Sequence, residues 1–159
     1  MKTQVKSIPD GYASAIPYLI IDGAASALEF YKKAFGATEV MRFPQPDGKI
    51  GHAEMKIGGA LFMLADEFPG MNYRGPRSLG GSPVSVMVYV ENVDALAQRA
   101  EKAGAKIQRA VADQFYGDRT CTLEDPFGHV WHFATHKEDL SPGEMQERAA
   151  SAKKEPQAA

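Results

Sequence analysis

The sequence predicts an α+β fold made of two copies of one module, each with a strand, a helix and three further strands. One observation is the matched order of periodic segments in the two halves, with apolar residues spaced by two in strands and by three to four in helices. The other is an internal repeat. AFGA at 34–37 aligns with KAGA at 102–105, and GGALFMLAD at 58–66 aligns with FGHVWHFAT at 127–135.

Residues 13–66 form the first predicted module. Its first strand, Ala15–Ile21, precedes an amphipathic helix over Ala24–Phe35, with Leu28, Tyr31 and Phe35 on one face. Gly36 follows the helix, as expected of a residue that ends it in the left-handed conformation. Three strands joined by the turns PDGK and GG complete the module: Thr38–Phe43, Gly51–Ile57 and Ala60–Ala65.

Residues 84–136 repeat this order. A strand over Val84–Val90 leads into a helix over Val93–Ala103, which has Asp94 in its first turn and Gly104 after its end. Three strands follow: Lys106–Val111, Arg119–Glu124 and Val130–Thr135. We expect the two modules to form one structural domain.

Two other segments flank the second module. Residues 67–83 are rich in Gly and Pro and are predicted to be a linker, long enough to reach across the molecule or to exchange modules between chains. Residues 137–159 form a C-terminal extension with a helix start at Ser141. After about residue 150 the extension is polar and Ala-rich, and we expect this tail to be disordered.

Composition narrows the function classes. The net charge of −2 argues against general binding of nucleic acid or of an anionic membrane. The single cysteine, Cys121, excludes an internal disulfide and fits a reducing compartment, and its strand position suggests a small core residue. No stretch approaches the roughly 20 apolar residues of a membrane span, and the start of the chain has no apolar signal region. We therefore expect a cytoplasmic protein.

The repeat, together with FYKKAFGA and DPFGHVWHF, resembles the vicinal oxygen chelate superfamily of glyoxalase I, extradiol dioxygenases, fosfomycin-resistance enzymes and bleomycin-binding proteins. The resemblance covers roughly residues 13–136. PQPDGKIGHAEMKIGG and ADQFYGDR are similar to a bacterial branch of glyoxalase/bleomycin-resistance-like proteins. The resemblance implies that each module curls its sheet, that two modules form a cup, and that the protein is a homodimer.

The resemblance also implies four places where metal enzymes of the superfamily carry ligands, on the first and last strand of each module. They fall here on Pro17, Met63 (or Phe62), Ser85 and His132. Proline has no ligand atom, a thioether is a soft ligand, and serine is rarely one. A catalytic metal needs about three protein ligands, so we predict no metal and no other cofactor.

The stretch DPFGHVWHFATH brings three histidines close in sequence, but not into one metal site. His129 and His132 are three residues apart and point to opposite faces of a strand. His132 and His136 share a face, but at roughly 3.3 Å per residue they lie more than about 10 Å apart. We interpret His132 as a hydrogen-bonding pocket residue, with a metal ligand joined by others from elsewhere as the alternative. His129 is assigned to the turn and His136 to a solvated strand end.

Strand alternation sorts the remaining side chains. The four valines of residues 84–90 are expected beneath the helices, whereas Ser85, Met87 and Tyr89 face the cup. Trp131 and Phe133 are expected in the core, opposite His132. His52 and Glu54 face either solvent or a wet cavity.

The loop DQFYGDRT offers aromatic surface and an expected ion pair between Asp118 and Arg119, either as a fixed hairpin or as a rim that closes over a ligand. The candidate ligand-binding residues are thus His52, Glu54, Met63, Met87, Tyr89, Tyr116, Arg119 and His132.

Together these features favour metal-free binding of a partly apolar small molecule, by a protein of the antibiotic-sequestering type or another ligand binder. The alternative is a metal-dependent lyase or dioxygenase of the vicinal oxygen chelate type. A third possibility is acid–base catalysis without a metal by Glu54 and His132, which requires the two side chains to converge.

Overall fold

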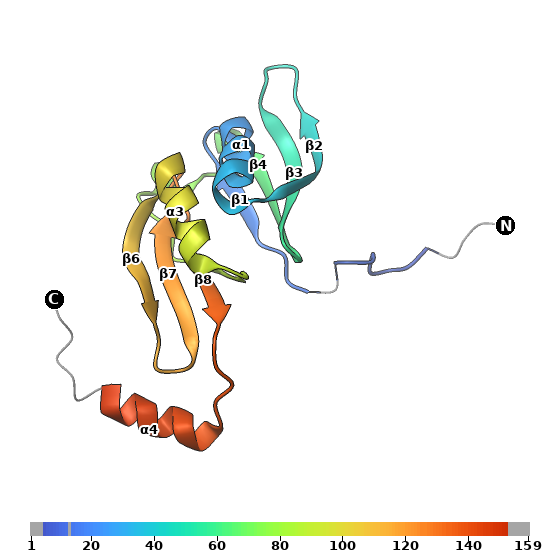
Figure 1. Ribbon diagram of the computed structural model, residues 1–159. Helices are drawn as coiled ribbons and strands as arrows, with labels where there is room; N and C mark the ends of the chain where they lie inside the picture. The colour runs from blue at the N-terminus through green and yellow to red at the C-terminus, as the bar shows by residue number, and fades with distance from the viewer. Residues whose placement is uncertain (1–4, 13, 153–159) are drawn as a thin grey trace. The chain divides into compact units, whose positions relative to one another are not determined.

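The computed structural model describes residues 5–12 and 14–152, which divide into two compact units (Figure 1). Unit 1 ends at Gly81 and unit 2 begins at Ser82. Each unit contains one of the two predicted modules. That the two modules form one domain stays a prediction.

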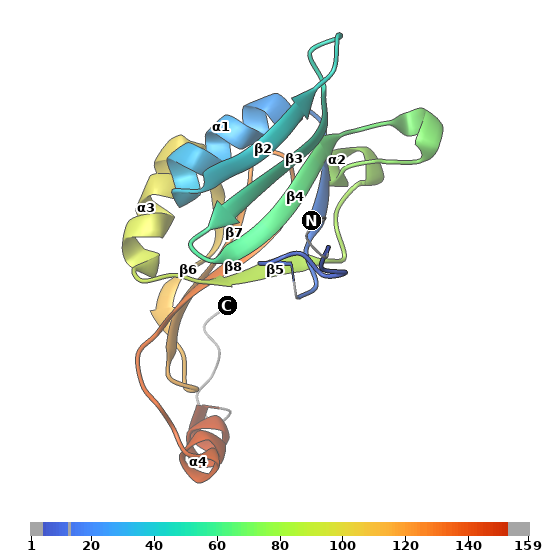
Figure 2. The same ribbon diagram turned by 90° about the vertical axis from the view of Figure 1, so that its right-hand side faces the viewer.

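Unit 1 is a four-stranded mixed sheet with one long helix on one face (Figure 2). The strand order is β1-β4-β3-β2, in which β1 is parallel to β4 and the other pairs are antiparallel. β1 begins at Tyr18 and not at Ala15 as expected, because Pro17 has no N–H to pair. The elements are β1 Tyr18–Ile21, α1 Ala24–Phe35, β2 Thr38–Pro44, β3 Ile50–Ile57 and β4 Ala60–Asp66.

Unit 2 has the same topology, with the strand order β5-β8-β7-β6 and a parallel pair between β5 and β8. The matching units confirm the predicted α+β fold of tandem βαβββ modules. The elements are β5 Ser85–Tyr89, α3 Val93–Ala103, β6 Lys106–Asp113, β7 Asp118–Glu124, β8 Val130–His136 and α4 Pro142–Ala152.

The helix-facing side chains form the core of each unit. In unit 1, Leu28 and Tyr31 of α1 are fully buried, as predicted. In unit 2, Trp131 and Phe133 are also fully buried, and their rings stack with centroids 6.0 Å apart. The indole Nε1 of Trp131 donates to Oδ2 of Asp125 over 2.9 Å, so the buried tryptophan has a polar partner.

One part of the core prediction is wrong. Val88 is buried and Val86 partly buried beneath the helix, but Val84 is 68% exposed. Val84 precedes β5, so the alternation of the strand does not extend to it. Cys121 is buried, as expected of a small core residue.

The segment after β4, which we predicted to be a linker, has local structure of its own. It contains a short 3₁₀ helix, η1 (Pro69–Met71), and a helical turn, α2 (Pro76–Leu79) (Figure 2). Glu67 fastens it, because its N–H donates to the carbonyl of Ile21 and its Oε1 accepts from the N–H of Gly75. Gly75 passes so close to β1 that an added Cβ would lie 2.7 Å from the Ile20 carbonyl oxygen. The segment up to Gly81 therefore belongs to unit 1.

The C-terminal extension forms α4, which begins at the predicted place. Ser141 and Glu144 form a capping box, in which the glutamate Oε2 accepts from the Ser141 N–H over 2.9 Å. α4 has no buried residue and continues to Ala152; the rest of the expected tail lies outside the described residues. Across residues 5–12 and 14–152, no helix combines the length and the apolar character that crossing a bilayer requires.

Candidate functional site

The candidate residues lie mainly on the open face of each sheet, the face that does not carry the helix. In unit 1 this face holds His52, Glu54 and Met63, because Ala53, Met55 and Ile57 alternate with the first two and point into the core. In unit 2 it holds Met87, Tyr89 and His132. Two candidates lie elsewhere: Tyr116 in the β6–β7 turn, and Arg119 on the helix-facing side of β7.

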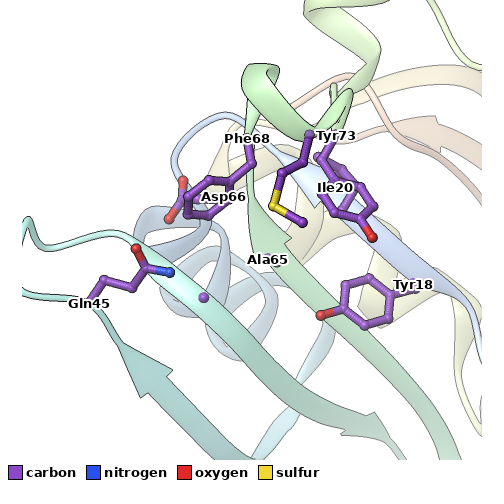
Figure 3. Close-up of a pocket in the computed structure, with 9 residues that line it drawn as sticks. Tyr18, Ile20, Gln45, Ala65, Asp66, Phe68 and Tyr73 are labelled. Atoms are coloured by element: carbon purple, nitrogen blue, oxygen red, sulfur yellow. The ribbon is translucent and has the colours of Figure 1, made fainter.

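Unit 1 has a pocket of about 400 Å³ on its open face (Figure 3). Tyr18 and Ile20 of β1 form one side, and Ala65 of β4 lies at its floor. The lining residues are Tyr18, Ile20, Gln45, Gly51, Ala65, Asp66, Phe68, Met71 and Tyr73.

The wall of this pocket comes from the segment predicted as a linker, residues 67–83. Phe68 and Tyr73 extend from it over the sheet (Figure 3), Met71 also lines the pocket, and a β-bridge between Phe68 and Tyr73 closes the turn. The signal was present in EFPGMNY, because three large apolar side chains in seven residues are unusual for a solvated linker. Only the pairing of this turn brings them together.

Beside the pocket, four side chains form a continuous hydrogen-bonded chain, which we call the Glu54 relay: Tyr12, Glu54, His52 and Tyr18. The Tyr12 hydroxyl donates to Oε2 of Glu54. Oε1 of Glu54 lies 3.2 Å from Nε2 of His52, and Nδ1 of His52 lies 2.7 Å from the Tyr18 hydroxyl. Glu54 is only 5% exposed, so its carboxylate is buried and has a partner on each oxygen.

Both phenols of the relay are harder to ionise than free tyrosine. The hydrogen bond to Glu54 raises the pKa of Tyr12. Burial raises the pKa of Tyr18, and the nearby Tyr73 and Glu54 raise it further. Both hydroxyls therefore keep their protons at neutral pH.

Strand pairing changes which residues lie opposite Met63 and His132, two of the expected ligand places. Tyr18, not Pro17, lies opposite Met63, and Met87, not Ser85, lies opposite His132. A phenol, a thioether and a single imidazole do not suit a catalytic metal. Among residues 5–12 and 14–152, no group of three His, Cys, Asp or Glu side chains could hold a metal ion.

Unit 2 has a smaller pocket of about 260 Å³ on its open face. His132 lies in its wall, with Nε2 at 3.0 Å from Oγ of Ser85 and Nδ1 at 2.8 Å from Oγ1 of Thr122. Both ring nitrogens thus have hydroxyl partners within unit 2, as a hydrogen-bonding pocket histidine requires. The lining residues are Ser82, Pro83, Val84, Ser85, Gln108, Arg109, Thr122, Val130 and His132.

His136 is not simply solvated, as expected, but lies between two carboxylates. Its Nδ1 is 2.7 Å from Oδ1 of Asp118 and its Nε2 is 2.9 Å from Oδ1 of Asp139. The hydrogen bonds to Asp139 and Asp118 raise the pKa of His136. Burial favours a higher pKa for Asp118, but its hydrogen bonds with Tyr89 and His136 leave that pKa lowered.

The predicted ion pair between Asp118 and Arg119 is wrong, because neighbouring strand residues point to opposite faces. Arg119 instead forks onto Asp94 at the start of α3, with N–O distances of 2.7 and 2.8 Å. It also donates to Asp113 across the β6–β7 hairpin over 3.0 Å. These contacts raise the pKa of Arg119 and lower that of Asp94, and they fix the hairpin rather than offer Arg119 to a ligand.

Comparisons with known proteins agree with this architecture. An uncharacterized protein of Mycobacterium bovis, Mb0911c, is 44% identical over 138 residues, which cover 85% of this chain and 91% of that protein. Among solved structures, TioX from Micromonospora sp. ML1 is similar with a TM-score of 0.62 and 26% identity, covering 81% of this chain and all of TioX. Protein PA1353 from Pseudomonas aeruginosa has the same TM-score at 25% identity, covering 79% and 98%.

The family comparison spans both units. The family model described as the Glyoxalase/Bleomycin resistance protein/Dioxygenase superfamily matches residues 14–133, which include every strand of both sheets up to Phe133. The chain therefore belongs to the glyoxalase/bleomycin resistance protein/dioxygenase superfamily.

Proposed function

We propose that this protein binds a partly apolar small molecule in the pocket of unit 1, without a metal. The observation that carries the proposal is a pocket of about 400 Å³ with walls formed mainly by aromatic and aliphatic side chains. This volume lies within the range of small-molecule sites, which are typically apolar with a few polar groups that fix orientation. Sequestration of an antibiotic would be one use of such a site.

The polar groups are few and lie at defined places. The carboxylate of Asp66 already accepts from the N–H groups of Gly23, Ala24 and Ile50, so its role is structural. Gln45 and the phenols of Tyr18 and Tyr73 are then the side chains that can meet a polar group of the ligand. This arrangement favours a flat apolar ligand with one or two polar substituents.

A filled pocket tests the proposal. Ala65→Leu adds three carbons at the floor, and Ala60→Leu adds the same group at the exposed start of the same strand. After a thermal-shift screen of aromatic compounds, we expect Ala65→Leu to weaken binding of the hits at least about tenfold, with Ala60→Leu unchanged.

Tyr73→Ala is a second test of binding that does not rely on adding a bulky side chain to the pocket. It removes a half-exposed wall residue and should also weaken binding. Hits that bind both pocket variants as they bind the natural sequence would contradict the proposal.

The alternative, a metal-dependent lyase or dioxygenase, needs ligands that the expected places do not supply, since Met63 and Tyr18 lie where two of them would be. Elemental analysis of protein purified without chelator tests this. We expect no near-stoichiometric Zn, Ni, Mn or Fe. A tightly bound metal that is lost on His132→Ala would favour the alternative.

We further propose a homodimer. β2 is an edge strand of the unit 1 sheet and exposes Val40, Met41 and Phe43, an apolar edge of the kind that proteins usually cover. Sedimentation at micromolar concentration should give the dimer mass. A monomer at every concentration would contradict this proposal.

A further inference from the structure

The Glu54 relay ends at Tyr18, a polar side chain of the pocket wall. The relay bears on whether the Tyr18 hydroxyl donates or accepts a hydrogen bond. Tyr18 belongs to both the relay and the pocket, because it lines the pocket (Figure 3) and its hydroxyl lies 2.7 Å from Nδ1 of His52 on β3. The direction of each hydrogen bond in the relay can be assigned from the buried end.

At that end the carboxylate of Glu54 can only accept. Tyr12 supplies the proton for Oε2, so Oε1 must accept from the ring of His52 at 3.2 Å. The proton of a neutral His52 is therefore assigned to Nε2. Its Nδ1 is then an acceptor, and the contact of 2.7 Å with Tyr18 requires the phenol to donate.

We propose that Tyr18 presents only a hydrogen-bond acceptor to the pocket, so that the site selects apolar ring compounds carrying a hydroxyl or amino donor over their methyl ethers. The inference rests on the proposed function, since it assumes that a ligand occupies this pocket. Its physical basis is that the phenol already donates its single O–H to Nδ1 of His52. Only the lone pairs of the phenol oxygen are then available to the ligand.

The other polar side chains at the wall do not set this preference. The Gln45 amide carries both donors and an acceptor, and the Tyr73 hydroxyl can act either way. The Asp66 carboxylate already accepts from three backbone N–H groups, of Gly23, Ala24 and Ile50, which hold it in its structural role. Tyr18 is thus the side chain whose direction of hydrogen bonding is fixed by a partner outside the pocket.

A matched pair of fluorescent probes tests the proposal: 2-naphthol and 2-methoxynaphthalene, titrated at about pH 8, where an ordinary histidine is neutral and a tyrosine protonated. We expect 2-naphthol to bind about fivefold or more tightly than the ether, as one hydrogen bond predicts. If neither probe binds, the proposed function fails. If both bind equally to the natural sequence, the pocket stands and the assignment of Tyr18 is overturned.

Two variants separate the phenol from its partner. Tyr18→Phe removes the acceptor, so the two probes should bind this variant with equal affinity. His52→Leu leaves Tyr18 in place but removes the acceptor of its O–H, so the phenol can donate to a ligand. The ether should then gain affinity, and the preference for 2-naphthol should fall or reverse. A structural role for His52 would weaken both probes equally, and that result would overturn the proposal. His136→Leu, in unit 2, should leave the preference unchanged.

Discussion

Unit 1 and unit 2 have the same topology and a similar helix-facing core, but their open faces differ. At the same place in the repeat, Asp66 and Thr135 hold the start of the long helix of their own unit. Asp66 accepts from Gly23 and Ala24 at the start of α1, and Thr135 accepts from Val93 at the start of α3. The open faces do not match in this way. Met63 lies opposite Tyr18 in unit 1, whereas His132 lies opposite Met87 in unit 2.

The two pockets follow from this difference. Unit 1 has the segment from Glu67 to Tyr73 folded over its sheet and a buried carboxylate that directs a histidine. Unit 2 has a smaller pocket in which His132 meets only hydroxyl groups. The internal repeat therefore accounts for the fold. The residues that differ between the two units lie on the open faces, and function has to be sought there.

The largest effect is expected from a substitution in the helix-facing core. Trp131→Ala should lower the free energy of unfolding by about 3–5 kcal/mol, because it removes a fully buried indole and leaves Asp125 without one donor. His132→Ala, the next residue on the opposite face, should cost less than about 1 kcal/mol. Denaturant unfolding monitored by circular dichroism measures both. Equal losses would show that the two faces of β8 are not divided as described.

A second pair of variants tests whether the helix-holding residues are equivalent. Asp66→Ala should destabilise by about 3 kcal/mol, because three backbone N–H groups lose a buried charged acceptor. Thr135→Ala should cost about 1 kcal/mol, because Asn92 still caps α3 by accepting from Ala95. Losses in the reverse order would contradict the assigned hydrogen bonds.

A third prediction concerns the pH dependence of unit 2. Because folding raises the pKa of His136, this residue stabilises the protein while it is protonated, and the stabilisation is lost as the pH rises through the folded pKa. Asp118 has a lowered pKa and behaves oppositely, so its contribution is lost only when the pH falls through its folded pKa. The melting temperature of the natural sequence should therefore exceed that of His136→Asn most at about pH 5–6 and least near pH 9.

The matched control is Asp139→Asn, which removes the contact that contributes most to the raised pKa. In this variant the NMR titration of His136 should move toward the ordinary histidine range. An unchanged titration would show that Asp139 does not act on the ring.

The smallest effect is expected at the end of the described chain. Truncation after Ala149 removes the last turn of α4, a helix with no buried residue, and keeps the exposed pair between Arg148 and Glu138. The melting temperature should change by less than about 2 °C, since surface positions rarely contribute more than about 0.5 kcal/mol. A fall of several degrees would show that the end of the chain docks.

The sequence by itself determined the repeat, the fold class and the helix-facing core. Helix limits, terminal glycines and the burial of Trp131 all follow from local periodicity, since each depends on residues close in sequence. It also indicated the open face, because period two assigns His52, Glu54 and His132 to one side of their strands. These features required no knowledge of which strand lies beside which.

Only the tertiary structure decided what these side chains do. The Glu54 relay joins Tyr12 and Tyr18 to residues more than 30 positions away in the sequence. Arg119 pairs with Asp94 on α3 and not with its neighbour Asp118. The pocket wall depended on the folding back of Phe68 to Tyr73 beside β1. Contacts of this kind depend on strand register and loop closure, which involve many distant residues at once, so no local pattern in the sequence specifies them.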